Sequence, residues 1–276
     1  MRVTYDPRAE REQKYAFIDS RHVLTNYTRS VSKWFPEKPE LDFARMIDPL
    51  GASRSFYYDC IDNLRRQGET DTDYDTRLQS QHADLNRVRS ARGCHIRLGV
   101  LKGGANKKEK RQKEIDVLIA VDMLTHAAQK NMRTAVLVTG DQDLKPAVES
   151  LVQLGVFVEL YGDAKGTSRE LTWAASAYNK LTFDEYFHWS ADRLIRKYPI
   201  PSKPSGFVSV AETVLATAQK GERHLELLKT EGPCEYGIRL KTMPHDSRTL
   251  WAHNELDRLK LYADIVLGEI AWQENN

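Results

Sequence analysis

The sequence has few cysteines, no long apolar run and almost no net charge, and each of these shortages excludes a class of protein. Its three cysteines, Cys60, Cys94 and Cys234, stand far apart and match no zinc-ligand spacing. No stretch approaches the roughly 20 consecutive apolar residues that a membrane span requires. A formal charge of +2 creates no strong whole-molecule field, so any basic surface for a nucleic acid must be local.

These features predict a cytoplasmic protein with reduced cysteines and no membrane partner. An odd number of thiols cannot be fully paired, and the charged N-terminus, Met1 to Lys14, is unlike a secretory signal. With 276 residues, of which 41% are hydrophobic, the chain is long enough for one large domain and a smaller one.

Short apolar or β-branched runs alternate with longer helical patterns through the first two-thirds of the chain. The runs are Tyr15–Ile18, Ser55–Cys60, His95–Leu101, Ala135–Val138 and Val156–Tyr161. Helical periodicity covers Tyr74–Ser90, Lys108–Lys130 and Pro146–Leu154. Thr167 and Glu170 have the spacing of a capping box, which predicts a further helix through about Asn179. This alternation predicts an α/β domain with a mainly parallel sheet.

The predicted α/β domain spans residues 1–188. A proline-rich linker, 189–206, follows it, because prolines spaced this closely cannot continue a helix. Residues 207–276 are predicted to form a small, mainly helical subdomain, with amphipathic helices over Val208–Lys229 and Ser247–Trp272 around one short strand. This subdomain carries no chemical motif, and its expected role is contact with a second copy of the chain or with a regulatory protein.

Four aspartates are placed where a parallel sheet would form a ligand site. Asp19 follows the first strand, Asp141 and Asp143 follow the fourth, and Asp116 lies on the helix before it. Two like charges about 4 Å apart repel by roughly 4 kcal/mol at an effective dielectric constant near 20, so converging aspartates need a cation or a shifted pKa. Carboxylate oxygens favour Mg²⁺ or Mn²⁺, which are suited to phosphodiester hydrolysis.

A basic run precedes Asp116. It contains six basic residues and one acidic residue, and the basic ones are Lys102, Lys107, Lys108, Lys110, Arg111 and Lys113. Such a run is commonly a solvated charged surface. Here it adjoins the position at which a scissile phosphate would lie, which favours binding of an RNA backbone without regard to sequence.

Three segments resemble, in order and spacing, the motifs of NYN domains in the PIN-like nuclease superfamily. They are Phe17–Ser20, Lys113–Val117 with Asp122 further on, and Val138–Leu144. The resemblance covers most of residues 14–188 and implies a PIN-like three-layer fold. It also implies an endoribonuclease, a hydrolase of single-stranded or structured RNA that uses Mg²⁺ or Mn²⁺. The residues implied as both metal-binding and catalytic are Asp19, Asp116, Asp141 and Asp143.

Alternatives remain open at several of these positions. His22 stands where members of the family commonly carry Asn, so a catalytically altered domain that binds RNA or a protein is the second hypothesis. Asp143 has the position of a helix N-cap. Asp122 falls on an apolar helical stripe, where a carboxylate costs free energy unless it is hydrogen-bonded or near a cation, so it is expected to have a structural role or to support the metal ligands. His22 is likewise expected to support the metal ligands. An α/β enzyme acting on a small phosphorylated metabolite is a third hypothesis.

Overall fold

The structure, a computed structural model, describes residues 13–99, 107–203, 212–231, 233–243 and 246–274. The chain divides into two compact units. Unit 1 contains the residues up to Val31 together with Pro39–Ala191. Unit 2 contains Ser32–Lys38 together with the residues from Asp192 onward. Within the described ranges, no helix is long and apolar enough to cross a membrane.

Unit 1 is built on a six-stranded, fully parallel sheet, which confirms the predicted α/β class. Its strands are β1 (Lys14–Asp19), β2 (Arg54–Asp59), β3 (Cys94–Leu98), β4 (Thr134–Val138), β5 (Phe157–Asp163) and β6 (Ala177–Leu181). Their order in the sheet is β3-β2-β1-β4-β5-β6, with Ile18 of β1 opposite Val138 of β4. From β1 the chain builds outward through β2 and β3, and it then returns to β4 on the other side of β1. The sheet therefore has its switch point between β1 and β4.

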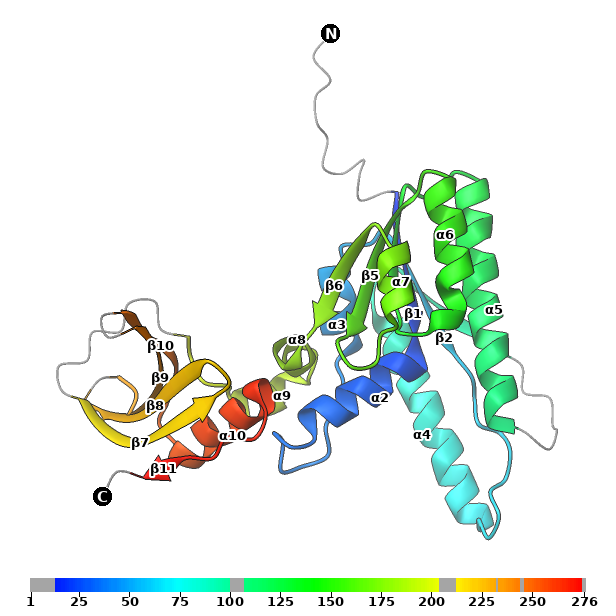
Figure 1. Cartoon of the computed structure of the whole chain (residues 1–276). Helices are drawn as coiled ribbons and strands as arrows, with labels where there is room; N and C mark the ends of the chain where they lie inside the picture. Colours follow the sequence, from blue (N-terminus) through cyan, green and yellow to red (C-terminus); the bar gives the residue numbers. More distant parts are fainter. Residues whose placement is uncertain (1–12, 100–106, 204–211, 232, 244–245, 275–276) are drawn as a thin grey trace. The chain divides into compact units, whose positions relative to one another are not determined.

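Helices cover both faces of this sheet and give three layers (Figure 1). The helices of unit 1 are α2 (Ser20–Val31), α3 (Phe43–Ile47), α4 (Asp71–Ser90), α5 (Lys107–Ala128), α6 (Lys145–Gln153), α7 (Arg169–Ala174) and α8 (Phe183–His188), with 3-10 turns η1 (Asp48–Leu50) and η2 (Gln142–Leu144). Alternate strand residues face opposite layers. Phe17 and Leu137 pack with Ile119 and Met123 of α5, whereas Tyr57, on the other face, stacks edge-on with Phe43 of α3.

The segment after β5 differs from the prediction. Ser168, not Thr167, caps α7, since its side chain accepts a hydrogen bond from the Leu171 N–H at 3.2 Å. The helix ends at Ala174, and β6 follows where the helix was predicted to continue. Pairing with β5 supplies the backbone hydrogen bonds of β6, and this non-local contact outweighs the local helical pattern.

Unit 2 contradicts the predicted, mainly helical C-terminal subdomain. It contains an antiparallel sheet of order β10-β9-β8-β7-β11. Its strands are β7 (Glu212–Lys220), β8 (Arg223–Thr230), β9 (Tyr236–Met243), β10 (Asp246–His253) and β11 (Gln273–Glu274), and its helices are α9 (Asp192–Lys197) and α10 (Leu256–Leu267). Within the first predicted helix, residues 208–211 lie outside the described part of the chain, and residues 212–229 instead belong to a hairpin that turns at Gly221, whose φ of +59° suits glycine. The apolar spacing of its leucines fits a helix and a strand alike, and strand pairing decides between them.

The segment 32–38 belongs to unit 2 because aromatic and cationic contacts attach it to α10. The Trp34 ring packs edge-on against Tyr262, and the Arg258 guanidinium lies 3.7 Å from the centre of the Trp34 ring. The Trp34 indole N–H donates to the carbonyl of Tyr198 at 2.9 Å. The predicted linker, 189–206, therefore contains helix α9 and part of the packed core of unit 2.

Candidate acidic site

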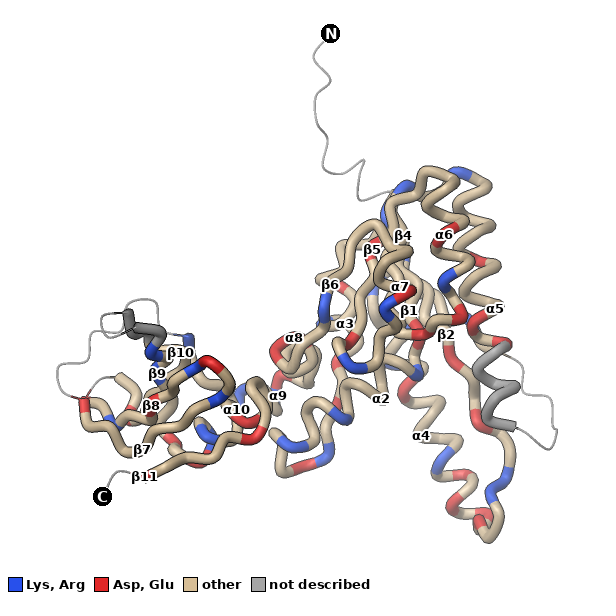
Figure 2. Tube along the Cα trace, viewed as in Figure 1, with Lys and Arg blue, Asp and Glu red and all other residues tan. Residues whose placement is uncertain are grey.

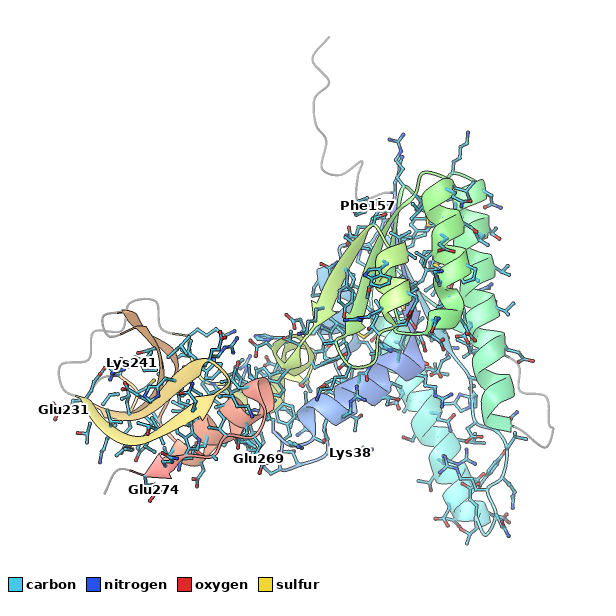
Figure 3. The ribbon with its side chains drawn as sticks, viewed as in Figure 1. Lys38, Phe157, Glu231, Lys241, Glu269 and Glu274 are labelled. Carbon is cyan, nitrogen blue, oxygen red and sulfur yellow. The ribbon has the colours of Figure 1, made fainter. Side chains whose placement is uncertain are left out.

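The candidate site lies at the carboxyl ends of β1 and β4, where a doubly wound sheet leaves a crevice for a ligand. Both strands are buried, and the chain passes from β1 into α2 and from β4 towards η2. Acidic positions gather where β1, β2 and α5 approach one another (Figure 2). The exposed Phe157 lies at the start of β5, at the amino-terminal ends of the strands and so opposite the candidate site (Figure 3).

Asp19 is buried at the start of α2 and is held by three hydrogen bonds. Its Oδ1 accepts from the N–H groups of Arg21 and His22, at 3.0 and 3.3 Å, and its Oδ2 accepts from the Thr139 hydroxyl at 3.0 Å. Burial raises the pKa of the Asp19 carboxyl, while these hydrogen bonds and the His22 charge oppose the rise. The side chain is therefore fixed in position, and its charge is incompletely compensated by the protein.

Asp141 and Asp143 lie on the turn that follows β4. Asp141 caps η2, because its Oδ1 accepts from the Asp143 N–H at 3.0 Å, so the cap is Asp141 and not Asp143. The Asp141 N–H donates to the Thr139 hydroxyl at 3.3 Å, and the same hydroxyl donates to Asp19. Thr139 thus links the two strand ends. Asp143 is exposed to solvent.

Asp116 approaches the same place from α5. It is only 7% exposed, and among the described residues its Oδ2 is buried without a hydrogen-bond partner. Burial, followed by the charges of Asp141, Asp19 and Asp143, raises the pKa of Asp116 to about 7. Asp19, Asp141 and Asp143 therefore lie within electrostatic reach of Asp116. No three His, Cys, Asp or Glu side chains in the described ranges are close enough together to hold a metal ion.

Two further carboxylates were missed by the sequence analysis. Asp59 ends β2, and burial raises the pKa of its carboxyl, with the nearby Asp19 charge adding to the rise. Asp163 ends β5, where its Oδ1 accepts from the N–H groups of Lys165 and Gly166, both at 2.8 Å. The signal that identified Asp19, a carboxylate directly after a strand, also applies to Asp59 and Asp163.

His22 lies beside Asp19 and lines the same pocket. The Asn26 amide nitrogen lies 3.1 Å from its Nε2, and burial lowers the pKa of the imidazole, while the charges of Asp19 and Asp163 oppose this change. A Cβ on Gly140 would lie 2.7 Å from His22 Cε1 and 2.1 Å from the Gly166 carbonyl oxygen. The β4–η2 turn therefore packs directly against the imidazole and the β5–α7 loop.

A model of the NYN domain matches residues 41–182, which is just over half of the chain. The chain belongs to the NYN domain family. The matched range includes Asp116, Asp141 and Asp143, and it begins after Asp19. The fold of unit 1 is accordingly nuclease-like.

Two proteins of uncharacterized or unknown function are similar to the chain. An uncharacterized protein, y4oD, of Sinorhizobium fredii is 30% identical over 110 residues, which cover 38% of this chain and 49% of that protein. The chain thus spans about half the length of this relative. A crystal structure of a protein of unknown function from Vibrio parahaemolyticus is 17% identical with a TM-score of 0.44, covering 66% of this chain and 98% of that one.

Asp122 of the NYN domain has partners of its own. Arg97 binds it with two hydrogen bonds of 2.8 Å, and the Tyr58 hydroxyl donates to it at 3.0 Å. These contacts join α5 to β2 and β3. A supporting role for Asp122 beside the metal ligands remains a prediction. The predicted RNA-binding residue Lys102 and the side chains of Lys107, Lys108, Lys110, Arg111 and Lys113 lie outside the described part of the structure.

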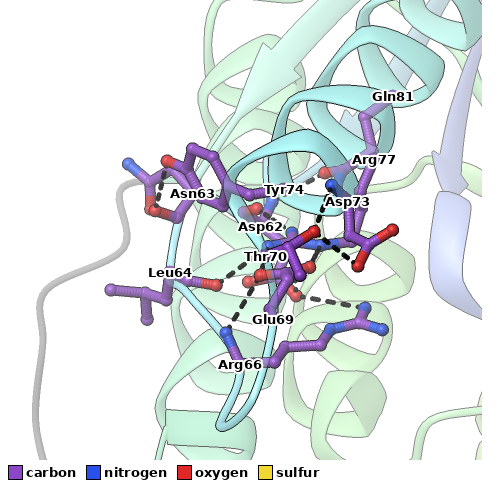
Figure 4. Close-up of polar contacts among 10 residues, drawn as sticks. All are labelled: Asp62, Asn63, Leu64, Arg66, Glu69, Thr70, Asp73, Tyr74, Arg77 and Gln81. Carbon is purple, nitrogen blue, oxygen red and sulfur yellow. Dashed lines mark hydrogen bonds and ion pairs between the residues drawn. The ribbon is translucent and has the colours of Figure 1, made fainter.

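The β2–α4 loop contacts α4 through several polar side chains, of which Arg77 makes the most hydrogen bonds (Figure 4). Arg77 forms two hydrogen bonds with the Glu69 carboxylate, at 2.6 and 2.8 Å, and donates to the carbonyls of Asp62 and Leu64. Gln81 accepts from the Asp62 N–H at 2.7 Å. The chain that leaves β2 beside Asp59 is thereby attached to α4.

Proposed function

We propose that the NYN domain is a metal-dependent endoribonuclease that hydrolyses RNA phosphodiester bonds with Mg²⁺ or Mn²⁺. The observation that carries the proposal is the Asp116 carboxylate, which is buried beside three other aspartates and whose pKa is raised to about 7. Burying a carboxylate near like charges costs free energy, so proteins retain such a group chiefly where it has a chemical role.

The chemistry of these side chains fits a hard divalent cation. The donors are carboxylate oxygens, and Asp116 Oδ2 has no hydrogen-bond partner among the described residues, so it is available as a ligand. No three of these side chains are close enough to hold an ion in the described structure, so Asp19, Asp116, Asp141 and Asp143 would have to move together to hold the ion or ions. When bound, such a cation lowers the pKa of a water molecule and stabilises the charge that develops on a phosphoryl group.

The other residues of the site keep these carboxylates in place. Thr139 and the first N–H groups of α2 fix Asp19, and the capping hydrogen bond with the Asp143 N–H fixes Asp141. Such positioning lowers the reorganisation that the reaction requires. RNA as substrate is supported by the family, and the basic residues at the start of α5 are proposed to bind its phosphates.

The test is cleavage of labelled single-stranded RNA, and of DNA with the same sequence, in Mg²⁺, Mn²⁺ or EDTA. We compare the wild type with Asp141→Asn and with Asp75→Asn, which removes an exposed carboxylate on α4. Since loss of groups that merely support a metal ligand costs about 10- to 100-fold, Asp141→Asn should lose about 100-fold or more, and Asp75→Asn should cleave normally.

The second candidate is an RNA-binding or protein-interaction domain without catalysis, and the observation that favours it is His22. Its imidazole is part of the wall next to Asp19, at the position where the family commonly has Asn. Binding of RNA without cleavage in either metal would support this candidate. Equal cleavage by the wild type and Asp141→Asn would place the activity elsewhere.

A further inference from the structure

Two pockets flank the four aspartates, and each has a volume of about 520 Å³. Asp19 and Asp141 line the first, here named the α2 pocket, and Asp116 and Asp143 line the second, named the α5 pocket. Gln142 lines both. The pockets therefore lie side by side, and the acidic centre forms the boundary between them. Each has a volume typical of a site for one small molecule or one nucleotide.

The walls of the α2 pocket are polar. Thr25 of α2 is exposed on one wall, and Lys165 of the β5–α7 loop is exposed on the other. This loop is held by hydrogen bonds, because Asp163 accepts from two of its N–H groups and the Ser168 N–H donates to the Gly140 carbonyl at 3.2 Å. A cation and hydroxyl groups held on hydrogen-bonded backbone are suited to a sugar and its phosphate.

The α5 pocket has a different composition. Apart from its two aspartates it is lined by Val117 and Ala120 of α5, by Pro146 of α6, and by Gln142 and Lys145. The Val117 side chain is 61% exposed and does not lie on the buried face of α5. An aliphatic surface of this kind, next to an acidic centre, is suited to the flat face of a base.

We propose that one strand of RNA lies across both pockets, with the scissile phosphate at the aspartates beside Gln142. The base of one flanking nucleotide rests on Val117, Ala120 and Pro146, and the sugar and phosphate of the other enter the α2 pocket near Lys165. The inference rests on the proposed nuclease function and makes the substrate single-stranded. A paired duplex cannot place its neighbouring nucleotides in two separate pockets.

The first experiment combines protein variants with RNA that carries one abasic ribose at a defined position. Cleavage by Val117→Asp is compared with cleavage by Val121→Asp, since Val121 is 52% exposed on the same helix and lines neither pocket. Loss of a base contact should lower cleavage of normal RNA by Val117→Asp about tenfold. At the linkage beside the abasic site, the wild type should be slowed to a similar extent, and Val117→Asp should cause no further loss.

A second measurement does not depend on cleavage. Binding of fluorescent single-stranded RNA is followed by anisotropy in EDTA at several salt concentrations, in an Asp116→Asn background. Lys165→Gln should weaken binding and reduce the salt-dependence slope by about one, because one phosphate contact is lost. Lys130→Gln changes a lysine just after the C-terminal end of α5, and it should leave both the affinity and the salt-dependence slope unchanged. Val117→Asp should also bind more weakly than Val121→Asp.

The outcomes separate this inference from the proposed function. If the wild type cleaves RNA but cuts evenly around the abasic site, and the two valine variants behave alike, the pocket assignment is overturned and the nuclease stands. If no protein cleaves, the nuclease proposal fails, and the anisotropy series alone decides whether RNA occupies the pockets. Equal thermal stability of Val117→Asp and Val121→Asp excludes misfolding as the cause of a difference.

Discussion

At Gly140 the turn that carries Asp141 has no room for a side chain. A Cβ there would lie 2.1 Å from the Gly166 carbonyl oxygen, a backbone atom that cannot move without displacing the loop. Gly140→Ala should therefore destabilise the protein by about 1–3 kcal/mol and abolish most cleavage, because Asp141 would shift. Urea unfolding gives the first value and the RNA assay gives the second.

Gly166, on the opposite side of this contact, is the matched control. A Cβ on Gly166 would have its closest contact at 3.4 Å, with Asp163 Oδ1, which is an ordinary van der Waals distance. Gly166→Ala should change the free energy of unfolding by less than about 0.5 kcal/mol. Similar losses in both variants would show that the contact between the turn and the loop does not have the importance assigned to it.

At the scale of secondary-structure elements, local sequence patterns predicted the correct helix or strand only where the tertiary contacts favour the same conformation. The first five strands of unit 1 were found because each is a short apolar run bounded by polar residues, and α5 was found from its apolar stripe. Strand β6 was missed, since its partner β5 lies elsewhere in the sequence, and of the sheet of unit 2 only part of β9 was predicted, as one short strand. The pattern of Leu225, Leu227 and Leu228 does not specify which backbone conformation satisfies the hydrogen bonds.

The site shows the same limit. The strand-end rule and the family motif together predicted the four aspartates as a site, which stays a prediction, and the charges of the other three act on Asp116 in the structure. Neither signal could identify Thr139 as the link between Asp19 and Asp141, because that role depends on how β1 and β4 pair. The same is true of the two pockets, which form from segments that are far apart in the sequence.

The β2–α4 loop offers a test of an element in which one side chain, Arg77, makes several of the holding contacts. Arg77→Ala removes the contacts with Glu69 and with two loop carbonyls, so the backbone N–H groups of residues 61–70 should exchange with deuterium about tenfold faster. Arg89→Ala, at the far end of the same helix, should leave the exchange in this loop unchanged. Protection that survives in Arg77→Ala would mean that the remaining contacts of the loop are sufficient.

At the scale of the whole molecule, the acidic site should make the stability of the metal-free protein depend on pH. The pKa of Asp116 rises from 3.8 to about 7 on folding, so the folded protein takes up a proton that the unfolded chain does not bind at pH 5. The contribution of Asp116 to the free energy of unfolding is fully present below pH 3.8 and is lost as the pH rises through about 7. The raised pKa of Asp19 acts in the same direction, whereas the lowered pKa of His22 acts against it.

Comparison with Asp116→Asn isolates this contribution, because both proteins share the other titrating groups. In EDTA between pH 5 and 8, the melting temperature of the wild type should fall relative to that of Asp116→Asn as the pH rises. Glu37 and Glu69, whose pKa values are lowered to about 2, lose their contribution only below this window. Parallel melting curves for the two proteins would show that Asp116 does not titrate as described.

Adding Mg²⁺ should reverse the sign of this pH dependence. A cation binds the ionised carboxylates in competition with protons, and it stabilises only the folded state, in which the four aspartates are together. The melting temperature of the wild type should then rise with pH between 5 and 8, and the increase should be much smaller in Asp116→Asn. If Mg²⁺ shifts both proteins equally at every pH, the ion binds outside the acidic site, and the raised pKa of Asp116 has a cause other than preparation for a metal.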